Sequence, residues 1–94
     1  MIRSYRDRRT QRFAGGERIP AFQAFAKQAE KRLETLDAAE SLQDLRALRS
    51  NRLEVLRGDR EGQLSIRINN QWRICFEWPA GHAGPSNVEI TDYH

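Results

Sequence analysis

Residues 52–78, RLEVLRGDREGQLSIRINNQWRICFEW, decide the fold of this chain. Aliphatic and polar residues alternate over 52–56, 63–68 and 71–78, a period of two that predicts three strands. The first connection is charged and contains Gly58 and Gly62, which supply the backbone freedom of a surface turn. Asn69-Asn70 predicts a second tight turn, because asparagine tolerates the left-handed conformation.

Alternation assigns the side chains of these strands to two faces. The face predicted to be buried carries Leu53, Val55, Ile66, Ile68, Trp72, Ile74, Phe76 and Trp78. The opposite face carries Glu54, Ser65, Arg67, Asn69, Gln71, Arg73, Cys75 and Glu77. A sheet with one packed face and one arginine-bearing face suits a phosphate chain, but an ordinary solvated face gives the same pattern.

Two helices are predicted before these strands. Pro20 favours a helix start. Apolar residues then recur at steps of three and four: Phe22, Phe25, Ala26, Ala29, Leu33 and Leu36. Asp37 or Ser41 can cap a second, shorter helix, with Asp44 three residues after Ser41 as in a capping box.

The two ends of the chain are predicted to be short elements. Residues 1–5 are interpreted as an edge strand, and residues 7–13 as a helical turn that Gly15-Gly16 closes. After a loop at residues 79–86, alternation over 87–94 predicts a last strand with Val88 and Ile90 in the core.

Composition limits the class of protein. Ninety-four residues predict one domain, residues 1–94, and 16 Lys+Arg against 13 Asp+Glu give a net charge of +3. Arginine dominates the basic clusters, which favours anionic partners such as RNA or an acidic protein over a membrane. With no apolar run near the roughly 20 residues of a membrane span and no apolar signal core, a cytoplasmic protein is expected. A single cysteine excludes an internal disulfide and a cysteine-rich zinc site.

Few side chains suggest chemistry by pattern alone. Cys75 has no histidine near it in sequence, and His82 has no second ligand at metal spacing, so neither is expected to act. His94 follows Asp92 and Tyr93 and is the best proton-transfer group at neutral pH. A frayed terminus is the alternative interpretation of this last histidine.

Several ordered motifs carry a resemblance to a known family. Gly58–Gly62, Ser65-Ile66, Asn70–Ile74 and the Asp92-Tyr93-His94 end resemble HigB-type toxins of the RelE/ParE superfamily. Asn51–Glu54 is similar to a stretch of the GraT-like group within them. The likeness is dense from Leu36 to His94 and thin over the first thirty residues.

The resemblance implies an α/β (α+β) fold of the RelE type, with two N-terminal helices packed on a twisted, mainly antiparallel sheet of four to five strands. It also implies the toxin of a type II toxin–antitoxin system. Such a toxin cleaves ribosome-bound messenger RNA in the 30S A site by 2′-hydroxyl attack, needs no metal or other cofactor, and inhibits translation. A HigA-type helix-turn-helix antitoxin neutralises it, and operator DNA is reached only through that antitoxin.

Carried over by position, the resemblance implies six catalytic residues: Glu54, Arg57, Arg73, Asp92, Tyr93 and His94. Arg60 and Arg67 are predicted to bind RNA, and no metal ligand is expected. Arg57 stands where other members have lysine, and Glu54 where some have histidine, so the general base stays open among Glu54, Asp92, Tyr93 and His94. The two arginines suit the charge of the phosphorane, and His94 suits proton transfer.

Two points stay open. Strict alternation puts Asp92 and His94 on the opposite side from Tyr93, so a twist or bulge is expected at the chain end. The alternative function is that of ParE-like relatives, which bind DNA gyrase without nuclease chemistry, and a weaker one is a degenerate member that only binds RNA or its antitoxin.

Overall fold

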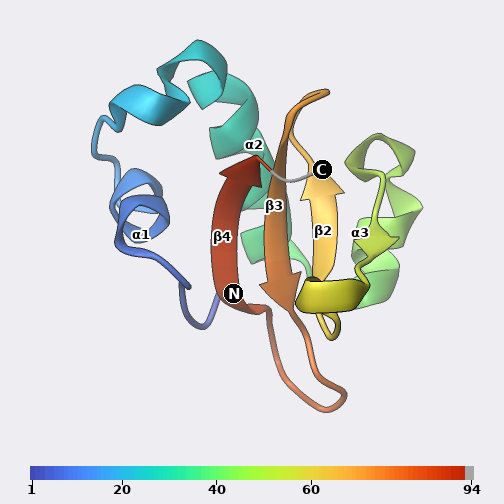
Figure 1. Cartoon of the computed structure of the whole chain (residues 1–94). Helices are drawn as coiled ribbons and strands as arrows, with labels where there is room; N and C mark the ends of the chain where they lie inside the picture. Colours follow the sequence, from blue (N-terminus) through green and yellow to red (C-terminus); the bar gives the residue numbers. More distant parts are fainter. Residues whose placement is uncertain (93–94) are drawn as a thin grey trace.

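An antiparallel four-stranded sheet forms the centre of this computed structural model, which describes residues 1–92 (Figure 1). Its strands are β1 (Glu54–Val55), β2 (Leu64–Arg67), β3 (Trp72–Glu77) and β4 (Ser86–Asp92), side by side in chain order. At the β2–β3 turn, the Asn69 side chain accepts the backbone N–H groups of Gln71 and of Trp72, the first residue of β3. The predicted α+β class is confirmed.

Helical segments lie on both sides of this sheet (Figure 1). They are α1 (Arg8–Ala14), η1 (Pro20–Phe25), α2 (Ala26–Ala38), α3 (Leu42–Ala47), η2 (Arg49–Asn51) and η3 (Gly58–Arg60), the η elements being 3₁₀ helices. Of these, α2 is packed on one face and η3 lies over the other. The prediction of one continuous helix from Pro20 was wrong, because the segment changes from 3₁₀ to α geometry at Phe25. In a 3₁₀ helix, residues three apart eclipse each other, which lets Phe22 and Phe25 both enter the core. Ser41 caps α3 by accepting the backbone N–H of Asp44.

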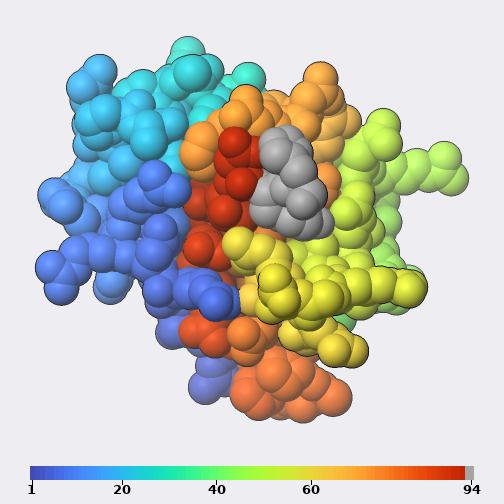
Figure 2. All heavy atoms as spheres, viewed as in Figure 1, coloured from blue at the N-terminus to red at the C-terminus, as the bar shows by residue number. Residues whose placement is uncertain are grey.

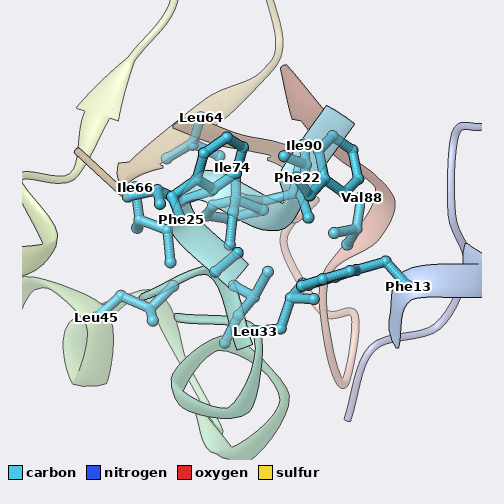
Figure 3. Close-up of a cluster of buried hydrophobic side chains, with 14 of the residues drawn as sticks. Phe13, Phe22, Phe25, Leu33, Leu45, Leu64, Ile66, Ile74, Val88 and Ile90 are labelled. Atoms are coloured by element: carbon cyan, nitrogen blue, oxygen red, sulfur yellow. The ribbon is translucent and has the colours of Figure 1, made fainter. Parts of the chain in front are cut away.

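The hydrophobic core lies between α2, η1 and the sheet (Figure 3). Sheet residues Ile66, Ile74, Phe76, Val88 and Ile90 and helix residues Phe22, Phe25, Leu33, Leu36 and Leu45 are all buried there. The Trp72 ring closes one end, with its centroid 4.8 Å from that of Phe25. The buried face predicted from alternation is confirmed over β2, β3 and β4.

Alternation fails at the first strand. Val55 is 65% exposed although it pairs with Leu64 and points to the same side of the sheet. The reason is its position on the edge strand, beyond the helices that cover the central strands. The strand is also shorter than predicted, because Arg52 takes a left-handed conformation (φ 45°) that interrupts the extended backbone before Glu54.

The N-terminal segment lies along β4. Tyr5 and Val88 form a single parallel bridge, flanked by backbone hydrogen bonds from Arg6 N to Val88 O and from Val88 N to Ser4 O. The predicted edge strand is therefore reduced to one bridge. Further along, the Thr10 hydroxyl of α1 accepts the N–H of Ile90 at 3.0 Å. Both contacts tie the beginning of the chain to its last described strand.

A bulge interrupts the pairing of β3 with β4. Cys75 pairs with Glu89 and Glu77 with Ser86, so β4 has one residue more than β3 in this interval. Asn87 absorbs the extra length with a left-handed backbone (φ 51°). The bulge thus lies at the start of β4, and pairing is regular through Trp72 and Asp92. Of the helices in residues 1–92, none is long and apolar enough to cross a membrane.

Candidate functional site

The face of the sheet opposite α2 carries the candidate chemistry. Register places Glu54, Ser65, Arg67, Arg73, Cys75, Glu89 and Thr91 on it, and this set is called the arginine face below. Sequence alternation predicts an open surface at this face, but Ser65 and Cys75 are fully buried. The expected open platform is therefore restricted to part of the face.

The segment around η3 covers the other part of the arginine face. Arg60 lies across the buried positions and donates from Nη1 to Glu89 Oε1 and to Gln63 Oε1, both at 3.1 Å. Gly58 (φ 66°) and Gly62 (φ 92°) supply the left-handed conformations on either side of this segment. Figure 2 shows the segment in yellow over the lower half of this face, with β4 in red beside it. Small side chains at Ser65 and Cys75 are required to accommodate it.

Arg73 is held in one orientation near the edge of this cover. Its Nε donates to Ser65 Oγ at 2.7 Å, and its Nη2 donates to the backbone oxygen of Arg52 at 2.7 Å. Glu54 Oε1 lies 4.0 Å from the same Nη2. The Arg73 side chain is only 13% exposed, whereas that of Glu54 is 55% exposed. The site thus holds a fixed guanidinium next to an accessible carboxylate.

A second arginine faces Arg73 directly. Arg67 is its cross-strand partner, an arrangement in which two like charges repel each other. The two side chains turn apart: Arg67 donates to Asn70 Oδ1 at the hairpin, and Arg73 turns toward β1. Arg57 is exposed and immediately precedes η3.

Cys75 is electrostatically linked to this cluster. Burial raises the pKa of its thiol from 9.0 to about 11, and the Glu89 carboxylate adds to the rise. The guanidinium groups of Arg60, Arg73 and Arg6 oppose it. The thiol is therefore protonated at neutral pH, which agrees with the expectation that Cys75 is not a nucleophile.

Asp92 lies apart from Arg73. Because it pairs with Trp72, its side chain belongs to the face opposite the arginine face. Its Oδ2 accepts a hydrogen bond from Gln71 Nε2, next to the β2–β3 turn, at 2.8 Å. Tyr93 and His94 lie outside the described residues. Of the predicted catalytic set, the structure therefore brings Glu54 and Arg73 together, and it does not bring Asp92 to them.

Sequence reasoning missed the groups that orient the arginines. Ser65 was recognised only as part of a motif, although its hydroxyl holds Arg73, and neither Gln63 nor Glu89 was predicted to hold Arg60. The role of Ser65 could have been found from the strand register. Ser65 pairs with Glu54 and with Cys75, and this register puts its small polar side chain beside Arg73. Within residues 1–92, no three histidine, cysteine or carboxylate side chains converge as metal ligands would.

Comparisons with known proteins agree on one family. A sequence model described as the RelE-like toxin of the type II toxin–antitoxin system HigB matches residues 3–94. The chain is 47% identical over 53 residues to Toxin HigB-1 of Vibrio cholerae serotype O1, which is 56% of each protein. It is 40% identical over 63 residues to Endoribonuclease HigB of Proteus vulgaris, covering 67% of this chain and 65% of that protein. The matched stretches thus span between about half and two thirds of these relatives.

Proposed function

Since this chain belongs to the HigB-like family of RelE-like toxins from type II toxin–antitoxin systems, we propose that it is a ribosome-dependent endoribonuclease. In this proposal it cleaves translated messenger RNA in the A site of the 30S subunit and thereby inhibits translation. One observation carries the proposal within the fold: Arg73 is fixed by two hydrogen bonds on the arginine face, beside the carboxylate of Glu54.

The reaction that fits this arrangement begins with attack of the 2′-hydroxyl on the adjacent phosphorus. It requires a base for the hydroxyl proton, positive charge for the pentacoordinate phosphorane, and an acid for the departing 5′-oxygen. A cation that is oriented before the reaction stabilises developing charge without a reorganisation cost. The two hydrogen bonds of Arg73 support this role for it, with Arg57 and Arg67 as further sources of positive charge.

The general base is proposed to be Glu54. Its carboxylate is accessible and lies 4.0 Å from Arg73, so a phosphate bound by Arg73 would bring a neighbouring ribose toward it. Asp92 belongs to the other face, which makes it a weaker candidate. Tyr93 and His94 stay in the proposed catalytic set, with His94 proposed as the acid and Tyr93 proposed to position the nucleotide.

A type II system implies an antitoxin, and we propose a HigA-type partner with a helix-turn-helix domain. Operator DNA would then be bound only through that partner. The other proposed partners are the ribosome and its messenger RNA in the cytoplasm. The name of the Proteus vulgaris relative, Endoribonuclease HigB, supports RNA cleavage over the gyrase-binding alternative.

The test uses a purified translation system. Wild-type protein is expected to cut a translated messenger and to leave the same RNA nearly intact without ribosomes. Arg73→Ala should lower cleavage by about 10²-fold or more, and His94→Ala should also relieve growth arrest. Arg46→Ala is the matched control, because Arg46 is exposed on α3 and lies in no ion pair described for residues 1–92.

Three results would contradict the proposal. The first is efficient metal-dependent cutting of naked RNA, tested with EDTA against the effect of EDTA on ribosomes alone. The second is full toxicity of Arg73→Ala and His94→Ala with unchanged circular dichroism. The third is inhibition of gyrase supercoiling without RNA cleavage, which would favour the ParE-like function instead.

A further inference from the structure

The positive charge of the chain is concentrated at its beginning. Residues 1–18 contain six arginines and two acidic residues, a net charge of +4. Residues 19–94 contain ten basic and eleven acidic residues, a net charge of −1. The excess of +3 therefore resides in the N-terminal segment, outside the strands that carry the proposed catalytic residues. This distribution needs a physical explanation, because like charges this close in sequence repel one another.

The N-terminal segment places one of these arginines on the arginine face. Tyr5 bridges Val88 and packs against the core, so the next residue, Arg6, points to the opposite side of the sheet. The charge of Arg6 is felt by the Cys75 thiol, which lies on that face. Arg6 therefore continues the arginine face beyond β4.

Four of the six arginines in residues 1–18 are in no ion pair within residues 1–92: Arg18, which follows α1, and three that lie before or at the start of α1. Arg3, Arg6 and Arg8, here called the N-terminal arginine group, are exposed, and their side chains donate no hydrogen bond to the described part of the chain. The neighbouring arginines differ. Arg9 lies 3.5 Å from an Asp7 carboxylate oxygen and packs over the Phe22 ring, and Arg12 pairs with Glu17.

An acidic side chain separates this group from the catalytic arginine, but its charge is compensated. Glu89 is on β4, between the N-terminal segment and β3, and accepts a hydrogen bond from Arg60 at 3.1 Å. The side chains of this pair are 26% and 19% exposed, so the two opposite charges are partly shielded from solvent. A polyanion lying from Arg73 toward Arg6 would therefore meet no uncompensated carboxylate at Glu89.

We propose that the N-terminal arginine group binds the sugar-phosphate backbone of RNA and extends the RNA-binding surface from the arginine face across β4. The proposal rests on the proposed function, and it assigns RNA binding to residues outside the catalytic set. Phosphate contacts of this kind fix the position of a nucleic acid without reading its sequence. They would hold the RNA strand while Arg73 acts on a single phosphate.

The test measures binding without chemistry. The probe is a single-stranded RNA with 2′-O-methyl riboses, which cannot undergo 2′-hydroxyl attack, and affinity is measured over a range of salt concentrations. The variant combines Arg3→Gln, Arg6→Gln and Arg8→Gln. The matched control combines Lys27→Gln, Lys31→Gln and Arg46→Gln, which removes the same charge from exposed positions on α2 and α3. A third variant with lysine at positions 3, 6 and 8 keeps the charge.

We expect the N-terminal glutamine variant to bind more weakly, with the slope of log affinity against log salt reduced by about 2, or roughly 0.7 for each lost phosphate contact. The control and the lysine variant should stay close to wild type. Equal losses in the N-terminal variant and the control would overturn the proposal, because they would reflect net charge alone. An unchanged slope in a folded N-terminal variant would also overturn it.

A second arm identifies the RNA. Vacant ribosomes replace the oligonucleotide, and a loss seen only with ribosomes assigns the surface to ribosomal RNA, whereas a loss with the oligonucleotide assigns it to the messenger. If the variant instead loses affinity for the antitoxin while RNA binding is unchanged, the surface serves a protein and the proposal fails. Cleavage by the wild type is assayed separately. If the wild type binds RNA through the N-terminal arginine group but does not cut translated RNA, the proposed function fails and the RNA-binding proposal stands.

Discussion

At the scale of single residues, Glu54 is the proposed base and the carboxylate nearest to Arg73 on the arginine face. It is exposed, it stands at the edge of the sheet, and its carboxylate lies 4.0 Å from the Arg73 guanidinium. At this distance and exposure the ion pair contributes little to stability. Two roles are proposed for Glu54: it acts as the base, or it orients Arg73.

Substitution of Glu54 separates these two roles. Glu54→Gln keeps the shape and the hydrogen-bonding reach but removes the basicity, and we expect cleavage of translated RNA to fall by about 10²-fold or more. Glu54→His should retain part of the activity, because imidazole can also accept the proton. Single-turnover cleavage by each variant is measured across pH. A Gln variant with the wild-type rate at every pH would make Glu54 structural.

Cys75 gives a prediction about stability and pH. Its pKa is raised by burial from 9.0 to about 11, so between these values the folded protein holds a proton that the unfolded chain has lost. Stability linked to this thiol is complete below pH 9 and is lost as the pH rises toward 11, with a slope of at most about 1.4 kcal/mol per pH unit. Urea unfolding of wild type and Cys75→Ala at pH 8 to 11 measures the difference. The pKa of Tyr5 is also raised by burial, but Tyr5 is present in both proteins, so its contribution cancels in the difference between their free energies of unfolding. Parallel pH dependences would show that Cys75 does not titrate in this way.

At the scale of elements, α1 is joined to the sheet by a single buried hydrogen bond. The Thr10 hydroxyl accepts the N–H of Ile90, which lies past the end of the N-terminal bridge and has no strand partner on that side within residues 1–92. Thr10→Val keeps the volume and removes the acceptor. We expect it to lower the free energy of unfolding by about 1 to 3 kcal/mol, the cost of an unsatisfied buried N–H.

The control for this prediction is another threonine. Thr35 in α2 donates its hydroxyl to the Lys31 carbonyl near the surface, so Thr35→Val should change the free energy of unfolding by no more than about 0.5 kcal/mol. Chemical denaturation of both variants provides the measurement. Equal effects of the two substitutions would show that the buried hydrogen bond between α1 and β4 contributes no more to the free energy of unfolding than the surface one in α2.

Elements could be predicted where local pattern and burial agree. Ile66, Ile74 and Ile90 follow strict alternation, and the structure buries all three in β2, β3 and β4. Alternation failed to predict burial where a segment distant in sequence covers the strand. Cys75 is buried on the face where Arg60, from the connection after β1, binds Glu89, the cross-strand partner of Cys75 on β4. No sequence period contains that information.

The candidate site was predictable to a similar extent. Alternation places Glu54, Arg67 and Arg73 on one face, as the strand register confirms, and the resemblance added the catalytic roles expected of Glu54 and Arg73. Neither reveals that the Arg52 carbonyl holds Arg73, because a left-handed residue is needed before β1. The predicted connection of Asp92 to this group conflicts with its pairing to Trp72.

At the scale of the whole molecule, the sequence predicts that residues 1–94 form one domain. We expect a single cooperative unfolding transition, in which far-UV circular dichroism and tryptophan fluorescence change together. Trp72 is a suitable reporter, since its ring packs against Phe22 and Phe25 between the helices and the sheet. A Trp78→Phe variant leaves Trp72 as the sole tryptophan. Transitions that do not coincide would indicate that part of the chain unfolds independently.

The contact between the first residues and β4 also determines when the fold is completed during synthesis of the chain. Ser4 and Asn87 are 83 residues apart in sequence, and Thr10 and Ile90 are 80 apart, so neither contact can form until β4 has left the ribosome. Until then β3 is an unpaired edge, and the N-terminal segment has no strand beside it. Contacts of such long range form late in folding. A nascent copy therefore lacks a completed arginine face while β4 is still inside the ribosome that makes it.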